Sequence, residues 1–454
     1  MREALLELIG DEARVSTSPS VLDQHARDFT HHPPHAPDVV VFPQSTEEVA
    51  AVLRYASAEK IPVVPYGAGS SLEGHTIPLY GGISLDLTRM DAVVDLRPED
   101  LLAVVQAGVT RSALNAKAQP HGLFFPVDPG ADATLGGMAA TNASGTTSVR
   151  YGSTRANVLA LEVVLADGTV VRTGSRARKT SAGYDLTSLF IGSEGTLGVI
   201  TEVTVRLHGM PELAVSARVT FPELEAACRT AVAIVAGGLT VSRVELLDER
   251  TLRAINAYKE ASYAEAPTLF VELAGAEAAV LGDLELAQLA AESEGALTFE
   301  SERGAEAQFA LWEARHHAAF ALIAAFPDKA RRTTDMCVPI SQLPGAIRHA
   351  QELVSKHELD FAIVAHAGDG NYHVGFAFDE DDPVQSAAAQ QMNDELVDYA
   401  LSVGGTCSGE HGIGMGKIGY LEREHGDLLP LMRGLKAMLD PAGILNPGKV
   451  LRPV

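Results

Sequence analysis

The sequence has only three cysteines in 454 residues, Cys228, Cys337 and Cys407, and no two of them form a CxxC pair. This scarcity excludes a disulfide framework, a cysteine-ligated zinc site and an iron–sulfur cluster built by this chain alone. Free, widely spaced cysteines are typical of a reducing compartment, so we expect a cytoplasmic protein.

Basic residues are also scarce relative to acidic ones. The chain has 35 Lys and Arg against 59 Asp and Glu, a formal net charge of −24. This balance argues against binding to nucleic acid or to anionic membrane surfaces. An anionic substrate would be repelled by the overall field, so it would need a local cationic group supplied by arginine or a metal.

Long hydrophobic runs are absent as well. The longest apolar run of note, residues 318–326, is far shorter than the about 20 residues that a membrane-spanning helix needs. The first residues form a charged amphipathic pattern without the apolar core of a signal peptide. We expect no transmembrane segment, although peripheral membrane attachment through a partner stays open. A hydrophobic content of 46% and the chain length predict two or three ordinary globular domains.

The first regular pattern is a β-α-β unit. Residues 39–42 read as a strand, Ser45 and Glu48 have capping-box spacing, and residues 61–67 read as a second strand that enters a glycine turn. More strand patterns follow to about residue 207. From Pro211 the pattern changes to alternating helices and strands, and residues 360–378 predict a β-hairpin.

A glycine-rich loop, "PYGAGSSLEGHT" at residues 65–76, follows the second strand of this unit. It fits neither common phosphate template, since Leu72 stands where a Rossmann loop needs glycine and His75 stands where a P-loop needs lysine. What remains is a run of backbone N–H groups able to surround a diphosphate. A plain glycine-rich surface turn is the alternative.

Two further stretches favour a ligand. Residues 136–145 are almost all small, which suits close approach of the backbone to a flat ligand better than it suits a core strand. Residues 189–203 carry three glycines at the start of a strand. Three such stretches in one domain predict one long ligand, and a dinucleotide has the right size.

Together these motifs resemble the FAD-binding domain of the vanillyl-alcohol oxidase and p-cresol methylhydroxylase (PCMH) superfamily. Within it, the chain is similar to the branch of D-lactate dehydrogenases, glycolate oxidase flavoprotein subunits and D-2-hydroxyglutarate dehydrogenases. The resemblance implies noncovalent FAD and an α+β fold: a two-subdomain PCMH-type FAD-binding domain, an α+β substrate (cap) domain with an antiparallel sheet, and a C-terminal tail that returns to the FAD domain. The expected boundaries are residues 1–35 for an N-terminal helical segment, 36–210 for the FAD-binding domain, 211–420 for the cap domain with its metal site, and 421–454 for the tail. The resemblance assigns FAD binding to Tyr66, Gly67, Ala68, Gly69, Ser70, Ser71, Leu72, Asp128, Thr134, Gly137, Ala140, Thr141, Ala143, Ser144, Gly145, Gly195, Val199, Ile200 and Asn446.

The predicted hairpin carries His366 and His373 on either side of a Gly-Asp-Gly-Asn turn. Histidines at a hairpin tip are usually just surface residues, but "SGEHGIG" at residues 408–414 adds a carboxylate and a third histidine among glycines. Two imidazoles and one carboxylate make a three-ligand site with open positions, as in catalytic metal sites. The resemblance implies His366, His373 and Glu410 as ligands of a divalent metal (Zn, Mn or Fe), with Asn371 beside the substrate.

With this set of residues, the resemblance implies oxidation of a D-2-hydroxy acid to the 2-oxo acid. The substrate would chelate the metal, which lowers the pKa of its hydroxyl, and the α-hydrogen would leave as hydride for flavin N5. His411 is the candidate base, although it could instead only orient Glu410. Arg315 best matches the arginine that binds the substrate carboxylate, with Arg331 and Arg332 as weaker candidates.

Several alternatives stay open on sequence alone. Thr333 and Thr334 stand where the hydroxyglutarate branch tends to carry a lysine, which favours D-lactate or glycolate over D-2-hydroxyglutarate. Two alternatives would catalyse a different reaction. One is an FAD-dependent enzyme like alkyl-glycerone-phosphate synthase, and the other is a His/His/Glu metallohydrolase in which the glycine loops are purely structural. The electron acceptor could be a quinone, a cytochrome, an electron-transfer flavoprotein, an iron–sulfur subunit or oxygen. A homodimer is one option for the assembly.

Overall fold

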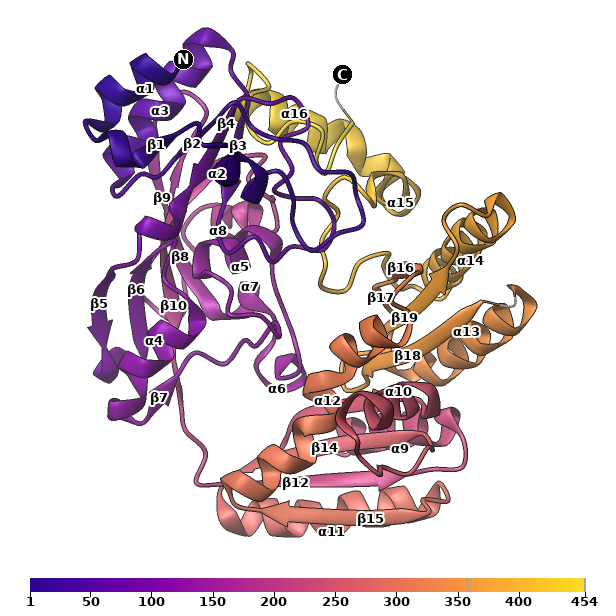
Figure 1. Ribbon diagram of the computed structural model, residues 1–454. Coiled ribbons are helices and arrows are strands. Elements are labelled where there is room, and N and C mark those ends of the chain that lie inside the picture. Colours follow the sequence, from indigo (N-terminus) through magenta and orange to yellow (C-terminus); the bar gives the residue numbers. More distant parts are fainter. Residues whose placement is uncertain (358, 453–454) are drawn as a thin grey trace. The chain divides into compact units, whose positions relative to one another are not determined.

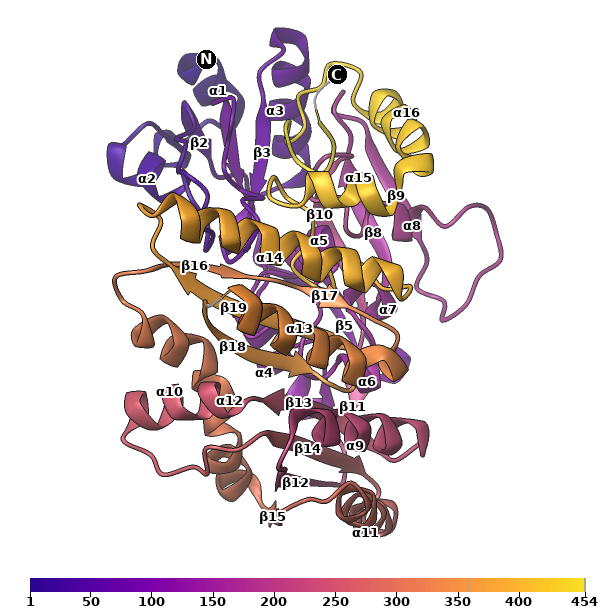
Figure 2. The ribbon, with the colours of Figure 1, turned by 90° about the vertical axis from the view of Figure 1, so that its right-hand side faces the viewer.

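The computed structural model describes residues 1–357 and 359–452, apart from a few side chains of one helix. The chain forms two compact units (Figures 1 and 2). The first unit comprises Met1–Ser144, Gly152–Met210 and the chain from Glu410 on, and the second comprises Gly145–Tyr151 and Pro211–Gly409. Residues 1–35 thus belong to the first unit, and the later boundary lies at Gly409 instead of residue 420.

A four-stranded sheet in the first unit contains the predicted β-α-β unit. Its order is β1 (Val15–Ser16), β2 (Val39–Val41), β4 (Ile83–Asp86) and β3 (Val63–Tyr66), with β2, β4 and β3 parallel. Helix α3 (Thr46–Glu59) connects β2 to β3 and buries an apolar face against the sheet. The Ser45 hydroxyl accepts the N–H of Glu48, as the capping-box spacing predicts.

The second sheet of this unit is antiparallel and has five strands. Its order is β5 (Val93–Arg97), β6 (Leu102–Gln106), β10 (Val199–Arg206), β8 (Val158–Val164) and β9 (Val170–Gly174). A separate pair is formed by β7 (Leu123–Phe124) and β11 (His208–Gly209). The helices are α1 (Arg2–Ile9), α2 (Pro19–Gln24), α4 (Arg111–Ala118), α5 (Leu135–Thr141), α7 (Thr154–Asn157), α8 (Leu186–Phe190), α15 (Ile418–Glu424) and α16 (Leu429–Leu439).

The C-terminal tail joins the four-stranded sheet. Val63 and Leu445 form a parallel bridge, in which Val63 donates its N–H to Ile444 and Asn446 donates its N–H to Val63. Lys436 secures the turn before this bridge by donating to the carbonyl of Leu445 and the carboxylate of Asp440. The tail therefore returns to β3, the strand that leads into the glycine-rich loop.

The second unit is built on one eight-stranded antiparallel sheet. Its order is β15 (Thr298–Arg303), β12 (Leu213–Thr220), β14 (Thr268–Gly275), β13 (Val241–Leu247), β18 (Asp360–His366), β19 (Asn371–Phe378) and β16 (Ala330–Thr333), and β17 (Met336–Cys337) also pairs with β19. The helices are α6 (Ser148–Tyr151), α9 (Leu224–Ala236), α10 (Glu249–Lys259), α11 (Glu277–Ser293), α12 (Ala305–Ala325), α13 (Leu343–His357) and α14 (Pro383–Ser402). Helix α14 packs on β17 and β19 beside α13 (Figure 2).

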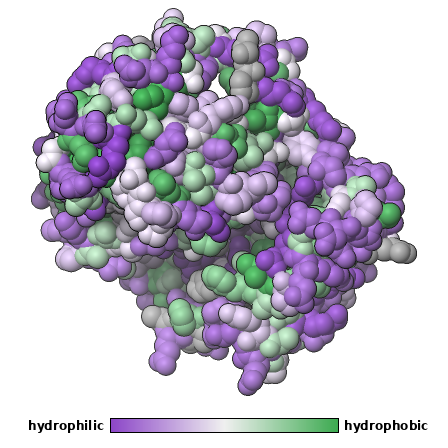
Figure 3. All heavy atoms as spheres, turned by 45° about the horizontal axis from the view of Figure 1, so that its top comes forward, coloured by the Kyte–Doolittle hydropathy of each residue, from purple (hydrophilic) through white to green (hydrophobic). Residues whose placement is uncertain are grey.

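On the face drawn in Figure 3, hydrophilic side chains predominate and hydrophobic ones are scattered among them. Among the helices of the described residues, we find none with the length and apolar character that crossing a bilayer requires.

Candidate active site

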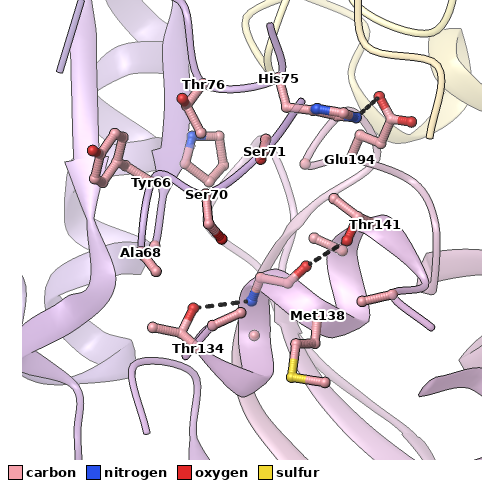
Figure 4. A pocket seen from close by; sticks show the side chains of 18 of the residues that line it. Tyr66, Ala68, Ser70, Ser71, His75, Thr76, Thr134, Met138, Thr141 and Glu194 are labelled. Atoms are coloured by element: carbon pink, nitrogen blue, oxygen red, sulfur yellow. Dashed lines mark hydrogen bonds and ion pairs between the residues drawn. The ribbon is translucent and has the colours of Figure 1, made fainter. Parts of the chain in front are cut away.

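Residues of all three glycine-rich stretches line one pocket of the first unit (Figure 4). It encloses about 1180 Å³ of empty space, including the solvent at its mouth. Sixteen of the residues predicted to bind FAD line it: Tyr66, Gly67, Ala68, Gly69, Ser70, Ser71, Leu72, Thr134, Gly137, Ala140, Thr141, Ala143, Ser144, Gly195, Ile200 and Asn446.

Two glycines of the loop after β3 cannot be replaced without distortion. Gly69 has a φ of +66°, and a Cβ atom there would lie 2.1 Å from the hydroxyl of Tyr66. A Cβ atom on Gly67 would lie 2.5 Å from Oγ1 of Thr134. The loop therefore presents backbone instead of side chains to the pocket, which is the property that a diphosphate cradle needs.

Buried polar atoms in the pocket wall also suit a polar cofactor. Asn446 donates from Nδ2 to the carbonyls of His75 and Glu194, at 3.0 and 2.8 Å. Its Oδ1 atom and Oγ1 of Thr76 are buried and have no hydrogen-bond partner among the described residues. Because unsatisfied buried polar atoms are costly, these two atoms fit a ligand that supplies donors.

An ion pair that the sequence analysis missed forms one side of the pocket. Nε2 of His75 lies 3.3 Å from Oε2 of Glu194, and both side chains are buried (Figure 4). Burial disfavours the charged form of both groups. The charge and hydrogen bond of the partner outweigh burial, so the pKa of His75 is raised and the pKa of Glu194 is lowered. The sequence singled out His75 only because it stands where a P-loop has lysine, which does not predict an ion pair with Glu194.

Glu194 also fixes the segment that carries two predicted site residues. Its carboxylate accepts the N–H groups of Ile413 and Gly414, at 2.7 and 2.8 Å. Glu194 itself has a φ of +55°, a conformation that costs a non-glycine residue on the order of 1 kcal/mol or more. Glu410 and His411, just before this anchor, both line the pocket. Ser144 donates to Oε2 of Glu410 at 3.1 Å.

The predicted hairpin is present in the second unit as β18 and β19. Nδ1 of His366 lies 2.7 Å from Oε1 of Glu245, and Nδ1 of His373 lies 3.0 Å from the carbonyl oxygen of Thr334. Ionised carboxylates and carbonyls only accept, so both Nδ1 atoms carry the proton. Nε2 is then the nitrogen that each imidazole can offer to a metal. The two rings lie 5.5 Å apart between centroids, edge to face.

Asp335 and Asn371 lie beside this pair. Asn371 donates from Nδ2 to Oδ1 of Asp335 at 2.9 Å and to the carbonyl of Met336 at 2.8 Å. Ser408 donates to the other oxygen of Asp335 at 2.9 Å. The structure allows Asp335 and His373 to offer ligand atoms within 4.8 Å of one another. Asp335, which the sequence analysis did not assign, is thus a further candidate of the metal-binding region.

The three predicted arginines differ in their surroundings. Arg315 on α12 donates from Nε to Oε2 of Glu245 at 2.7 Å. Arg331 donates to carbonyls at the end of α12, and Arg332 donates to Gln390, in exposed positions. Only Arg315 shares a partner with a histidine of the hairpin, which supports its preference over the other two.

Three residues predicted to bind FAD do not line the pocket. Val199 lies in the hydrophobic core of the first unit, because successive residues of β10 face opposite ways and it is the next residue, Ile200, that faces the pocket. Asp128 pairs with Arg111 at 3.2 Å, and Gly145 belongs to the second unit. The lining residues that were not predicted are Pro65, His75, Thr76, Leu87, Ala107, Pro129, Ala131, Ala133, Gly136, Met138, Glu194 and Gly198.

Comparison with known proteins gives consistent matches over most of the chain. Residues 37–174 match the family described as FAD binding domain, and residues 210–450 match FAD linked oxidases, C-terminal domain. The D-lactate dehydrogenase (cytochrome), mitochondrial, of Arabidopsis thaliana is 45% identical over 93% of this chain and 75% of its own length. Glycolate oxidase subunit GlcD of Bacillus subtilis (strain 168) is 34% identical over 99% of this chain and 96% of its own. The solved structure of p-cresol methylhydroxylase with substrate bound is similar in fold, with a TM-score of 0.79 at 18% identity, over 99% of this chain and 95% of that one.

Proposed function

We propose that this chain, which belongs to the FAD-linked oxidases, oxidises a small D-2-hydroxy acid to the 2-oxo acid with the help of a divalent metal. Membership of the family makes it an FAD-dependent oxidoreductase. The observation that carries the finer proposal is the pair His366 and His373, whose Nδ1 atoms both donate to acceptors of the second unit. Imidazoles tied in this way are typical of metal ligands.

FAD is proposed to bind in the pocket of the first unit. The loop from Tyr66 to Leu72 would hold the diphosphate with its backbone N–H groups, and the small residues around α5 would face the flavin and ribityl chain. The free acceptor on Asn446 and the hydroxyl of Thr76 would bond to polar groups of the cofactor. FAD, when bound, supplies the oxidant that takes the α-hydrogen of the substrate as hydride.

His366, His373 and Glu410 are proposed to hold the divalent metal, with Asp335 as a further candidate. The donor set of two imidazoles and carboxylates suits Zn²⁺, Mn²⁺ or Fe²⁺ and leaves coordination positions for substrate. A metal held by these residues supplies Lewis acidity that favours loss of the hydroxyl proton. Glu410 follows directly on Gly409, whose N–H donates to the carbonyl of Asp335 at 3.0 Å.

The remaining side chains would bind and deprotonate the substrate. Arg315 would bind the carboxylate of the substrate. It would thus supply the local positive charge that an anionic substrate requires in a chain of net charge −24. Asn371 has a buried Oδ1 without a hydrogen-bond partner in the described part of the chain, and this atom would accept a hydrogen bond from the substrate. An imidazole nitrogen of His411 would take the proton of the hydroxyl group.

The substrate and the electron acceptor follow from the relatives only as proposals. The names of the relatives favour D-lactate or glycolate as substrate. A cytochrome, or a partner subunit in a larger enzyme, would accept the electrons, as the words "cytochrome" and "subunit" in those names suggest. The cytoplasmic location stays a prediction, since the Arabidopsis relative is named as mitochondrial.

Anaerobic stopped-flow measurement of flavin reduction tests this function. The FAD-loaded protein would be mixed with D-lactate, L-lactate, glycolate and D-2-hydroxyglutarate, before and after treatment with a chelator. We expect bleaching of the flavin by D-lactate or glycolate, little by L-lactate, and a large loss of rate after chelation. If only D-2-hydroxyglutarate bleaches the flavin, D-2-hydroxyglutarate replaces D-lactate and glycolate as the proposed substrate. If no hydroxy acid bleaches the flavin, the proposed reaction is refuted. Bleaching that a chelator does not slow would refute the role of the metal in the proposed reaction.

A further inference from the structure

Glu245 on β13 is a buried carboxylate that contacts two proposed site residues at once. It is 0% exposed, and in the sheet it lies opposite His366 on β18. Oε1 accepts Nδ1–H of His366 at 2.7 Å, and Oε2 accepts Nε–H of Arg315 at 2.7 Å. One carboxylate oxygen thus accepts from an imidazole of the hairpin, and the other accepts from the arginine of α12.

Both oxygens of Glu245 act as acceptors. The guanidinium of Arg315 can only donate, and it pairs with this carboxylate at 2.7 Å. An ionised carboxylate cannot donate, so it fixes the His366 tautomer with the proton on Nδ1. A buried ion pair of this kind is weak evidence of a purely stabilising role, since apolar residues often stabilise as well or better.

The contact with Arg315 is equally selective. Glu245 binds the guanidinium through Nε, and among the side chains that the structure describes its two terminal nitrogens make no hydrogen bond. Those two nitrogens form the edge of the guanidinium that can bind a carboxylate in a bidentate manner. Glu245 therefore leaves the recognition edge of Arg315 available while it restrains the side chain.

We propose that Glu245 is a positioning residue that couples metal binding to substrate binding, by holding the metal-ligating tautomer of His366 and the orientation of Arg315 through one carboxylate. The inference rests on the proposed function. It assigns to Glu245 no contact with substrate or cofactor. It predicts that the affinity for the metal and the KM for the hydroxy acid depend on the same buried side chain.

Glu245→Gln is the direct test, and Co²⁺ alone is the probe of the metal site. We expect the affinity of the metal-free, FAD-loaded variant for Co²⁺ to fall by about 10–100-fold. The visible d–d spectrum of the Co²⁺-saturated variant should differ from that of the wild type. KM for the hydroxy acid should rise, because a glutamine amide cannot accept from Arg315 and His366 together. FAD content should be unchanged, since the pocket residues all belong to the first unit.

Glu272→Gln is the matched control. Glu272 lies on the neighbouring strand β14, accepts from Ser242 at 2.6 Å and pairs with Arg243 at 3.4 Å. It makes no hydrogen bond or ion pair with a histidine of the described residues. Loss of this carboxylate changes the charge of the same sheet without touching the hairpin. Equal losses of Co²⁺ affinity in the two variants would overturn the proposal, because the effect would then come from general destabilisation.

The tautomer of His366 can be measured without any change at Glu245. In the metal-free wild type, ¹⁵N NMR of labelled histidine, assigned with His366→Gln, should show His366 protonated on Nδ1. Protonation on Nε2 would overturn the proposal even if Glu245→Gln failed to fold. If the wild type binds Co²⁺ and His366→Gln does not, equal affinity in Glu245→Gln refutes only the role of Glu245. If the wild type binds no Co²⁺, the proposed metal dependence falls, and this inference falls with it.

Discussion

Glu194 accepts the backbone N–H of Ile413 at 2.7 Å, although 219 positions separate the two residues in the sequence. The contact holds the C-terminal segment with Glu410 and His411 against the wall of the pocket that we propose for FAD. It depends on the negative charge of Glu194, which the buried imidazole of His75 maintains. The geometry of the proposed catalytic segment therefore depends on an ion pair that does not contact the reacting atoms.

This pair predicts a specific pH dependence of stability. The lowered pKa of Glu194 contributes stability above the ordinary glutamate pKa, and the raised pKa of His75 contributes stability that is lost as pH rises through it. The contribution is thus largest between about pH 4.3 and 6.5 and declines above that window. Urea unfolding of wild type and His75→Gln should show a stability difference that shrinks from pH 6 to pH 9. A constant difference would show that the pair is not charged.

Asp28 provides a second pH-dependent effect of opposite origin. Burial raises its pKa to about 6, against the opposing effects of His75 and nearby backbone N–H groups. A raised carboxylate pKa favours the folded state below the ordinary aspartate pKa, and the benefit is lost as pH rises through about 6. Asp28→Asn should therefore stabilise the protein by about 1–3 kcal/mol at pH 8 and flatten the profile between pH 4 and 6. Unchanged stability at pH 8 would contradict the shift.

Gly69→Ala should weaken FAD binding. A side chain at Gly69 meets both the positive φ and a contact of 2.1 Å with the Tyr66 hydroxyl, so the loop must move. Gly122→Ala is the matched control, since Gly122 has a φ of +69° and nothing within 4 Å of its added Cβ. Both should lose about 1–2 kcal/mol of stability. Only Gly69→Ala should lose FAD on gel filtration, and equal retention would argue against the diphosphate loop.

Glu410→Gln should lose the metal and keep FAD. An amide is a weaker ligand than a carboxylate for a divalent cation, while the pocket retains its glycine loops and Asn446. Metal content by atomic emission and FAD content by absorbance would be measured on the same preparation. Equal metal content in variant and wild type would refute Glu410 as a ligand and leave Asp335 to be tested in its place.

His411→Ala should keep both cofactors and slow flavin reduction by about 10²–10⁴-fold, the usual contribution of a general base. The comparison is made by single-turnover reduction at saturating hydroxy acid, where binding does not limit the rate. An unchanged rate with reduced metal content would instead assign His411 to orienting Glu410.

Local sequence was sufficient for the parts of the fold that depend on residue type alone. Glycine at 67 and 69 and the small residues from 136 to 145 predicted a pocket lined by backbone, since no other residues allow so close an approach. The predicted α+β fold of the PCMH type and the FAD-linked oxidase activity class are confirmed by the matched families and the solved structure. The strand pattern with an Asp-Gly reversal likewise predicted the hairpin of His366 and His373.

Only the tertiary structure revealed which residues, distant in the sequence, contact the side chains of the proposed site. "TVSRVELLDE" reads as a strand, but it does not say that Glu245 lies opposite His366, 121 positions away. In the same way, period two shows that Val199 and Ile200 face opposite sides, and only packing decides that Ile200 faces the pocket. Periodicity reports that a strand is buried, whereas partner and facing surface are set by long-range packing that a single sequence does not specify.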